Sequence, residues 1–160
     1  MFEAKTQFNM LSVKKVNFVA EPGLFLDIDT TDTTQTLLVK ATGGYWGILD
    51  SIVTDADLFK ERTLSSVMYK HRKVKVGGAV DCLTGSGQIL TDNVVKSPAT
   101  GFLSATTPTD TEIEIYDGQP RVLQTGGRKA GRVIRYIPAS DDVEFGNTVE
   151  GWLLQINEGA

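Results

Sequence analysis

The chain has 160 residues but only one cysteine, Cys82, and one histidine, His71. A structural zinc site needs four ligands drawn mainly from cysteine and histidine, and a catalytic zinc site needs three. An intrachain disulfide needs two cysteines, so the sequence excludes a disulfide-stapled scaffold. We therefore predict no metal site, and no residue is assigned as a metal ligand or as a cofactor-binding residue.

The two residues also make a poor catalytic pair. His71 lies in the run Lys70–Lys73, where neighbouring positive charge opposes its protonation. Cys82 alternates with Val80, which predicts a small buried residue on one face of a strand. A dyad formed through space stays open, but no third group near either residue would orient it. General acid–base groups are sparse, so we predict no catalytic residue and no enzyme.

Long apolar runs are missing as well, so we expect no transmembrane helix. Residues 1–11 contain no continuous apolar stretch of the kind found in a signal peptide. The chain carries 16 basic and 20 acidic residues, for a net charge of −4. Proteins that bind nucleic-acid phosphates are normally basic, so neither nucleic acid nor a membrane is an expected partner.

Three stretches match known ligand-binding motifs only in part. Residues 126–132 have the glycine spacing of a phosphate-binding loop, but Arg132 and Val133 stand where that loop has lysine and a hydroxyl residue. Residues 85–90 lack the third glycine of a dinucleotide-binding loop, so both stretches are predicted to be hairpin turns. Residues 27–32 begin like a calcium-binding loop, but aspartate and leucine stand where glycine and glutamate are needed. We predict a solvated turn there, and calcium in another oxygen cage stays open.

What the sequence does contain is a series of short alternating stretches separated by glycine, aspartate and asparagine. Alternation with many β-branched residues is typical of strands that bury one face. Strands are predicted at residues 23–29, 36–41, 73–76, 111–116, 132–137 and 151–156. Glu112 and Glu114 are expected on the exposed face of their strand. The pattern predicts a mainly β fold, a small β-sandwich or β-barrel, with at most one short helix at residues 51–62 that starts at Thr54 or Asp55.

The N-terminal segment, residues 1–22, has dispersed apolar side chains. It ends at Pro22-Gly23, a pair of residues that interrupts regular secondary structure before the first alternating stretch. Two interpretations stay open. The segment is an extended N-terminal arm that docks on a neighbouring subunit, or it is an ordinary first strand. Residues 23–160 are predicted to form a single β-rich domain.

Basic and aromatic residues supply the candidate contacts with a partner. Two basic patches are predicted, at Lys70, Arg72, Lys73 and Lys75, and at Arg121, Arg128, Lys129, Arg132 and Arg135. Such patches on an acidic chain favour recognition of an acidic protein surface. The candidate partner-contact residues are Phe2, Phe8, Met10, Lys14, Lys15, Tyr45, Trp46, Arg128 and Lys129. For Tyr45 and Trp46 the sequence does not decide between a place in the core and a place at an interface, whereas Trp152 is expected in the core.

The stretch Val74–Asp81, followed by Gly85–Leu90, resembles a hairpin found in tailed-phage capsid decoration (cement) proteins. Residues 101–105 and 131–134 are similar to the short strands and exposed turns of that family. The resemblance implies a non-enzymatic viral structural protein without a cofactor. It would be made in the host cytoplasm and located on the outer capsid surface of the virion.

In this family the protein binds the major capsid protein as a homotrimer and stabilises an icosahedral head. The resemblance therefore implies the same partner and the same oligomeric state for this chain. An alternative is a carbohydrate- or receptor-binding β-domain of a phage tail or adhesin. A stable trimer would favour the first function, and a monomer that binds glycans would favour the second.

Overall fold

The computed structural model describes residues 2–6, 8–52, 79–139 and 150–157. Every regular element within these ranges is a β-strand, and they contain no helix. The prediction of a mainly β fold is thus confirmed. The predicted strand at 73–76 and all of the predicted helix except Ser51 and Ile52 lie outside the described residues.

Five strands close into a barrel in the order β2-β4-β3-β5-β6. They are β2 (Asn9–Val16), β3 (Phe25–Ile28), β4 (Leu37–Lys40), β5 (Gly47–Ile52) and β6 (Ala79–Thr84). Strand β2 closes the barrel because it pairs in parallel with β4 on one side and antiparallel with β6 on the other. All other barrel pairs are antiparallel.

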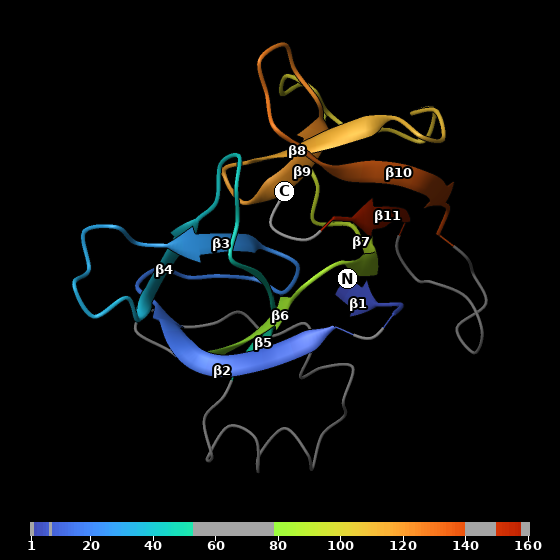
Figure 1. Cartoon of the computed structure of the whole chain (residues 1–160). Coiled ribbons are helices and arrows are strands. Elements are labelled where there is room, and N and C mark those ends of the chain that lie inside the picture. Colours follow the sequence, from blue (N-terminus) through green and yellow to red (C-terminus); the bar gives the residue numbers. More distant parts are fainter. Residues whose placement is uncertain (1, 7, 53–78, 140–149, 158–160) are drawn as a thin grey trace.

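The remaining six strands form an antiparallel sheet in the order β1-β7-β11-β10-β8-β9. They are β1 (Phe2–Ala4), β7 (Gly87–Thr91), β8 (Glu112–Tyr116), β9 (Gln119–Val122), β10 (Lys129–Ile137) and β11 (Gly151–Ile156). In Figure 1 the barrel, in blue to green, lies beside this sheet, most of which is yellow to red.

The N-terminal segment contributes to both parts of the fold. Strand β1 pairs with β7 at one edge of the sheet, and β2 is part of the barrel wall. The side chain of Phe2 is only 3% exposed and packs in the core. Of the two interpretations of residues 1–22, the structure shows paired strands, and the described part of the segment does not extend away from the body as an arm.

Two apolar clusters make up the core. One fills the barrel and includes Leu26, Leu49 and Cys82. The other lies between the barrel and the sheet and includes Phe25 and Ile48, together with side chains of the sheet. Successive side chains of a strand point to opposite faces, so β3 places Phe25 toward the sheet and Leu26 into the barrel. In the same way, β5 places Ile48 toward the sheet and Leu49 into the barrel. Burial on both faces explains why β3 and β5 each carry two adjacent large apolar residues.

The turn between β8 and β9 fastens the sheet to the barrel. Asp117 and Gly118 both have positive φ, 48° and 83°, as a two-residue type I′ hairpin turn requires. The Gly118 amide donates to the carbonyl of Ala41 at 2.8 Å, and the Phe25 amide donates to the carbonyl of Gly118 at 2.8 Å. The Asp117 amide donates to Oγ1 of Thr42 at 3.0 Å. Main-chain bonds at this turn therefore hold the two sheets in a defined position.

Neither of the two glycine-rich stretches predicted to be hairpin turns joins paired strands. Residues 85 and 86 connect β6 of the barrel to β7 of the sheet. Residues 123–128 connect β9 to β10, and both of these strands pair with β8, which lies between them. The turns were predicted correctly, but the hairpins were wrong, because the pairing partner of a strand is chosen by the tertiary fold and not by the turn alone.

Candidate functional site

The single cysteine has no features of a nucleophile. Cys82 is fully buried in the barrel interior, as predicted. Burial, with smaller contributions from the charges of Asp81 and Asp50, raises the pKa of its thiol to about 12. A thiol is nucleophilic as the thiolate, so this group is inert at neutral pH. His71, the other member of the possible dyad, lies outside the described residues.

The acidic run at residues 27–32 begins in β3 and continues into a hydrogen-bonded turn. The carboxylate of Asp32 accepts hydrogen bonds from the Thr34 hydroxyl and from the amides of Thr34, Thr36 and Leu37. These bonds, the Thr34 hydroxyl first, hold the pKa of Asp32 well below its usual range. Among the described residues, no group of three or more histidine, cysteine, aspartate or glutamate side chains could hold a metal ion. The same residues include no helix long and apolar enough to cross a membrane.

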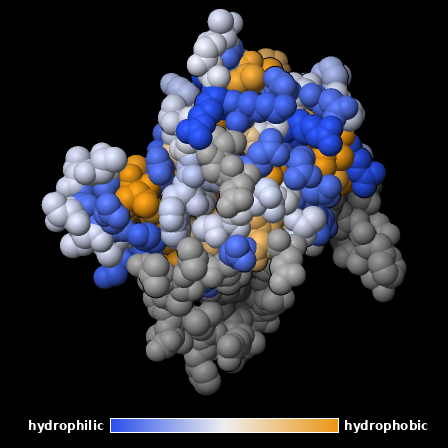
Figure 2. Space-filling model, in the orientation of Figure 1, coloured by the Kyte–Doolittle hydropathy of each residue, from blue (hydrophilic) through white to orange (hydrophobic). Residues whose placement is uncertain are grey.

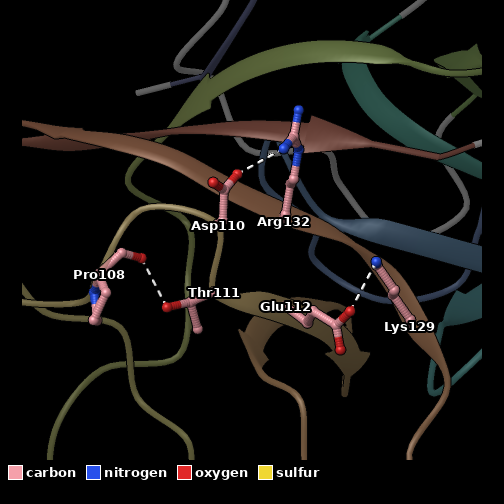
Figure 3. Close-up of polar contacts among 6 residues, drawn as sticks. All are labelled: Pro108, Asp110, Thr111, Glu112, Lys129 and Arg132. Atoms are coloured by element: carbon pink, nitrogen blue, oxygen red, sulfur yellow. Dashed lines mark hydrogen bonds and ion pairs between the residues drawn. The ribbon is translucent and has the colours of Figure 1, made fainter.

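A row of three ion pairs crosses the outer face of the sheet. The carboxylates come from alternate positions along and just before β8, and the cations come from the flanking strands. The pairs are Asp110 with Arg132 at 2.6 Å, Glu112 with Lys129 at 2.9 Å and Glu114 with Arg121 at 2.7 Å. Figure 3 shows the first two pairs, together with the hydrogen bond from Thr111 to Pro108. We call this set the ion-pair row.

One member of the ion-pair row corrects a prediction. Glu112 is exposed as expected, but Glu114 is only 5% exposed. The connection from β9 to β10 brings Gly127 onto the Glu114 carboxylate, so close that an added Cβ would lie 1.7 Å from Oε2. Alternation gave the correct face of the strand for Glu114. It could not show that a loop distant in the sequence covers this face.

The ion-pair row also changes the meaning of the predicted basic patch on the sheet. Arg121, Lys129 and Arg132 each have a carboxylate partner, so most of this patch is neutralised within the chain. Arg128 and Arg135 are exposed. The other predicted basic patch, at residues 70–75, lies outside the described residues. The sheet therefore presents a surface of mixed charge.

The barrel carries lysines of a different kind. Lys14 Nζ lies 5.4 Å from the ring centroid of Trp46, and Lys40 Nζ lies 5.9 Å from that of Phe18. Both distances are typical of cation–π interactions. Both rings are half-buried and pack against the core of the barrel, and the neighbouring Val19 is 60% exposed. We call Lys14, Phe18, Val19, Lys40 and Trp46 the barrel patch.

The barrel patch was predicted only in part. Lys14 and Trp46 were among the candidate contacts, but Phe18, Val19 and Lys40 were not. Each cation–π pair joins residues more than twenty positions apart, so local patterning gives no signal for it. Figure 2 shows that hydrophobic residues form small patches between hydrophilic ones over both the barrel and the sheet.

Two of the remaining candidate contacts are in the core. Phe2 is buried, and Tyr45 is buried with its hydroxyl donating to the carbonyl of Asn157 at 2.6 Å. Tyr45 is thus a core residue, which resolves one open alternative, and Phe2 and Tyr45 offer little surface to a partner. Phe8 is half-buried, and Lys15 is exposed. Met10 lies in β2.

Aromatic residues of the sheet and of the β7–β8 connection divide between core and surface. Trp152 is buried as predicted, and its Nε1 donates to the carbonyl of Ser104 at 3.1 Å. Tyr116 is 47% exposed and Phe102 is 42% exposed. The Arg121 guanidinium lies 3.8 Å above the Tyr116 ring centroid. Tyr116 was missed as an exposed residue, although it lies two positions after Glu114, so the alternation that placed Glu112 and Glu114 on the outer face also indicates this face for Tyr116.

A scan against protein-family models finds no matching family, and searches of curated proteins and of solved structures also find no match. The functional argument therefore rests on the residues and their geometry.

Proposed function

We propose that this chain is a non-enzymatic viral structural protein that decorates and stabilises an icosahedral phage capsid. In this proposal it binds the major capsid protein as a homotrimer on the outer surface of the head. The observation that carries the proposal is the barrel patch, where two lysines lie over half-buried aromatic rings and Val19, the residue after Phe18, is exposed. Aromatic residues with an apolar neighbour and a charged rim are typical of protein–protein interfaces.

The state of the reactive groups supports a binding function over catalysis. The Cys82 thiol is buried with a raised pKa. The carboxylates of Asp110, Glu112 and Glu114 are paired with cations on neighbouring strands. General acid–base catalysis needs a titratable group that can exchange a proton with a substrate, and these groups are engaged in structure.

The way in which the barrel and the sheet are joined supports a stabilising function. Main-chain hydrogen bonds from the Asp117-Gly118 turn cross to the barrel, and a shared apolar cluster fills the space behind it. A body held in this way presents its surface in one fixed arrangement, which lowers the entropy lost on binding. A subunit that reinforces a shell benefits from such rigidity.

The test is to mix the purified full chain with expanded, undecorated heads of the phage that encodes it. Saturable binding, together with a trimer measured by light scattering on a sizing column, is the expected result. Absence of binding to those heads would remove the proposal, whatever the oligomeric state.

A second function, a carbohydrate- or receptor-binding domain of a tail or adhesin, is favoured by one observation. Tyr116 is exposed, with a guanidinium on its ring, at the end of the sheet. Exposed aromatic rings beside polar groups are suited to sugars, which combine apolar faces with hydroxyls. A monomer that binds glycans, and that loses binding in Tyr116→Ala, would favour this function over capsid decoration.

A further inference from the structure

We propose that Asp117-Gly118 is a site of spontaneous main-chain modification, the conversion of aspartate to isoaspartate, and that hydrogen bonds of the folded turn to Ala41 and Thr42 block it. The sequence contains a single Asp-Gly pair and no Asn-Gly pair. The inference does not depend on the proposed function, because it rests on the geometry of this turn alone. The chain is protected at this site while it is folded and loses the protection when the turn opens.

The reaction needs no partner other than water. The main-chain nitrogen of Gly118 attacks Cγ of the protonated Asp117 carboxyl group and forms an N–Cγ bond. The Cγ–OH bond breaks, and the hydroxyl and the amide proton leave as water, so the product is a five-membered succinimide ring. Water that cleaves the new N–Cγ bond restores aspartate. Water that cleaves the original C–N bond gives isoaspartate, in which the main chain runs through Cβ and Cγ.

The residues of this site favour the attack. Glycine has no Cβ, so no side chain beside its nitrogen hinders the approach of the carboxyl carbon. Asp117 is exposed, so solvent reaches its carboxyl group and can open the ring. Burial of the aspartate therefore does not protect the site, and the protection has to come from the geometry of the main chain.

The folded turn keeps the attacking nitrogen away from the carboxyl carbon. Asp117 has φ of 48° and Gly118 has φ of 83°, as in a type I′ turn, in which ψ of the first central residue is about +30°. In a planar five-membered ring, Cβ of Asp117 eclipses the Gly118 nitrogen, whereas this ψ turns Cβ to the far side of the Cα–C bond. Ring closure therefore requires the aspartate to leave the turn conformation.

Hydrogen bonds from the barrel hold the turn in this conformation. The Gly118 amide, which must lose its proton in the reaction, donates to the carbonyl of Ala41 at 2.8 Å, and the Gly118 carbonyl accepts from the Phe25 amide at 2.8 Å. The Asp117 amide donates to Oγ1 of Thr42 at 3.0 Å. The reacting nitrogen is thus bonded to the barrel, and it becomes available only when the junction between the sheet and the barrel opens.

The modification should also prevent the junction from forming again. Isoaspartate adds one atom to the main chain of a two-residue turn whose flanking residues, Tyr116 and Gln119, are paired. Gly118 is packed so closely that a Cβ alone would lie 2.7 Å from Cδ1 of Leu24. A longer main chain has no room at this position, so a chain modified while unfolded should not regain the native junction.

The first experiment incubates the full chain at neutral pH in heavy-oxygen water, folded in buffer and unfolded in guanidinium chloride. Each passage through the succinimide introduces one solvent oxygen, which mass spectrometry of the digested chain locates. In guanidinium chloride Asp117 should take up label faster than Asp110, which threonine follows. In buffer the labelling of Asp117 should be at least about tenfold slower, because only the open turn reacts. Equal rates at Asp117 in both conditions, or labelling of the unfolded chain no faster than at Asp110, would overturn the inference.

Variants show whether the hydrogen bonds of the turn provide the protection. Thr42→Val removes the acceptor of the Asp117 amide and should raise the labelling rate of the folded protein about fivefold. Thr111→Val is the matched control, because the Thr111 hydroxyl donates to Pro108, before the other end of β8, and it should label like the wild type. Equal rates in the two variants would contradict the assignment of the protection to this turn.

Refolding tests the consequence of the modification. Chains incubated in guanidinium chloride are diluted into buffer, and the folded fraction is collected from a sizing column. Unmodified chains should return to the folded fraction, and chains with isoaspartate at position 117 should be absent from it. Isoaspartate at this position in the folded fraction, in the same proportion as in the starting material, would show that the junction accepts the longer main chain.

Discussion

Gly127 lies directly on the carboxylate of Glu114, and a Cβ at this glycine would approach Oε2 to 1.7 Å. The contact closes the β9–β10 connection over the sheet and buries the ion pair between Glu114 and Arg121. Burial of a charged group is costly unless it is paired and hydrogen-bonded, so glycine, carboxylate and guanidinium depend on one another.

Gly127→Ala should destabilise the fold by about 1–3 kcal/mol, because the loop must move away from Glu114 or the carboxylate must leave Arg121. Urea denaturation of the full chain measures the loss. The cost should be smaller when Gly127→Ala is made in a Glu114→Ala background, where the clashing group is gone. Identical costs in the two backgrounds would contradict the proposed contact.

Glu114→Ala should cost about 3–5 kcal/mol, because it leaves the Arg121 guanidinium without its partner in a largely buried position. Glu112→Ala provides the matched comparison on the same strand and face. Its pair with Lys129 is exposed, with side-chain exposures of 52% and 47%, so the loss should be at most about 1 kcal/mol. Comparable losses of unfolding free energy in the two variants would show that burial does not distinguish them.

Gly118→Ala should weaken the junction between the sheet and the barrel. The glycine has φ of +83°, and an added Cβ would lie 2.7 Å from Cδ1 of Leu24. Gly43→Ala is a close control, since Gly43 also has φ of +83° but has no atom within 4 Å of an added Cβ. We expect about 1 kcal/mol for the control from backbone strain alone, and about 2–4 kcal/mol for Gly118→Ala from strain and overpacking. Thermal or urea unfolding would show whether the two losses differ.

The Cys82 thiol should be protected from thiol reagents in the native protein. It should react with a disulfide reagent only as the chain unfolds, so the rate of modification should rise with urea in parallel with loss of structure. Fast modification of the folded protein at neutral pH would show that the barrel interior is open to solvent.

The Cys82 thiol also makes the free energy of unfolding depend on pH in the alkaline range. Its pKa is about 12 in the folded protein against the usual value of 9.0, so the unfolded state loses its proton first. The stabilising effect of the neutral thiol is complete below pH 9.0 and is lost as pH rises toward 12. Cys82→Ala should therefore lose less stability than the wild type over this interval, measured by urea unfolding at each pH. An equal decline in both proteins would assign the alkaline loss to other groups.

Local features of the fold could be predicted from the sequence because they depend on near neighbours in the chain. Alternation located β3, β8 and β11, and it placed Cys82 in the core; Trp152 is also in the core, as expected. The Asp117-Gly118 turn follows the predicted strand at 111–116 and consists of the aspartate and glycine that separate the alternating stretches, and these residues tolerate the positive φ of a type I′ turn. These signals operate over a few residues, which is also the range of the backbone conformations that cause them.

Strand pairing could not be predicted in the same way. Residues 85 and 86 form a short turn, yet they join a strand of the barrel to a strand of the sheet. Strand β10 follows β9 in the sequence but pairs with β8 instead of with β9. The parallel pairing of β2 with β4 closes the barrel across a wide separation in sequence. Each choice depends on which apolar faces can be buried together, and this is a property of all the strands at once.

The sequence by itself determined that this is a mainly β chain with an alternating pattern, an inert cysteine and exposed charge on a mixed surface. Only the tertiary structure decided which charges remain available. It paired Arg121, Lys129 and Arg132 with carboxylates on the sheet, and it placed Lys14 and Lys40 over aromatic rings on the barrel. The physical reason is that alternation decides the face of a strand, whereas the charge of a surface depends on which strands and loops become neighbours.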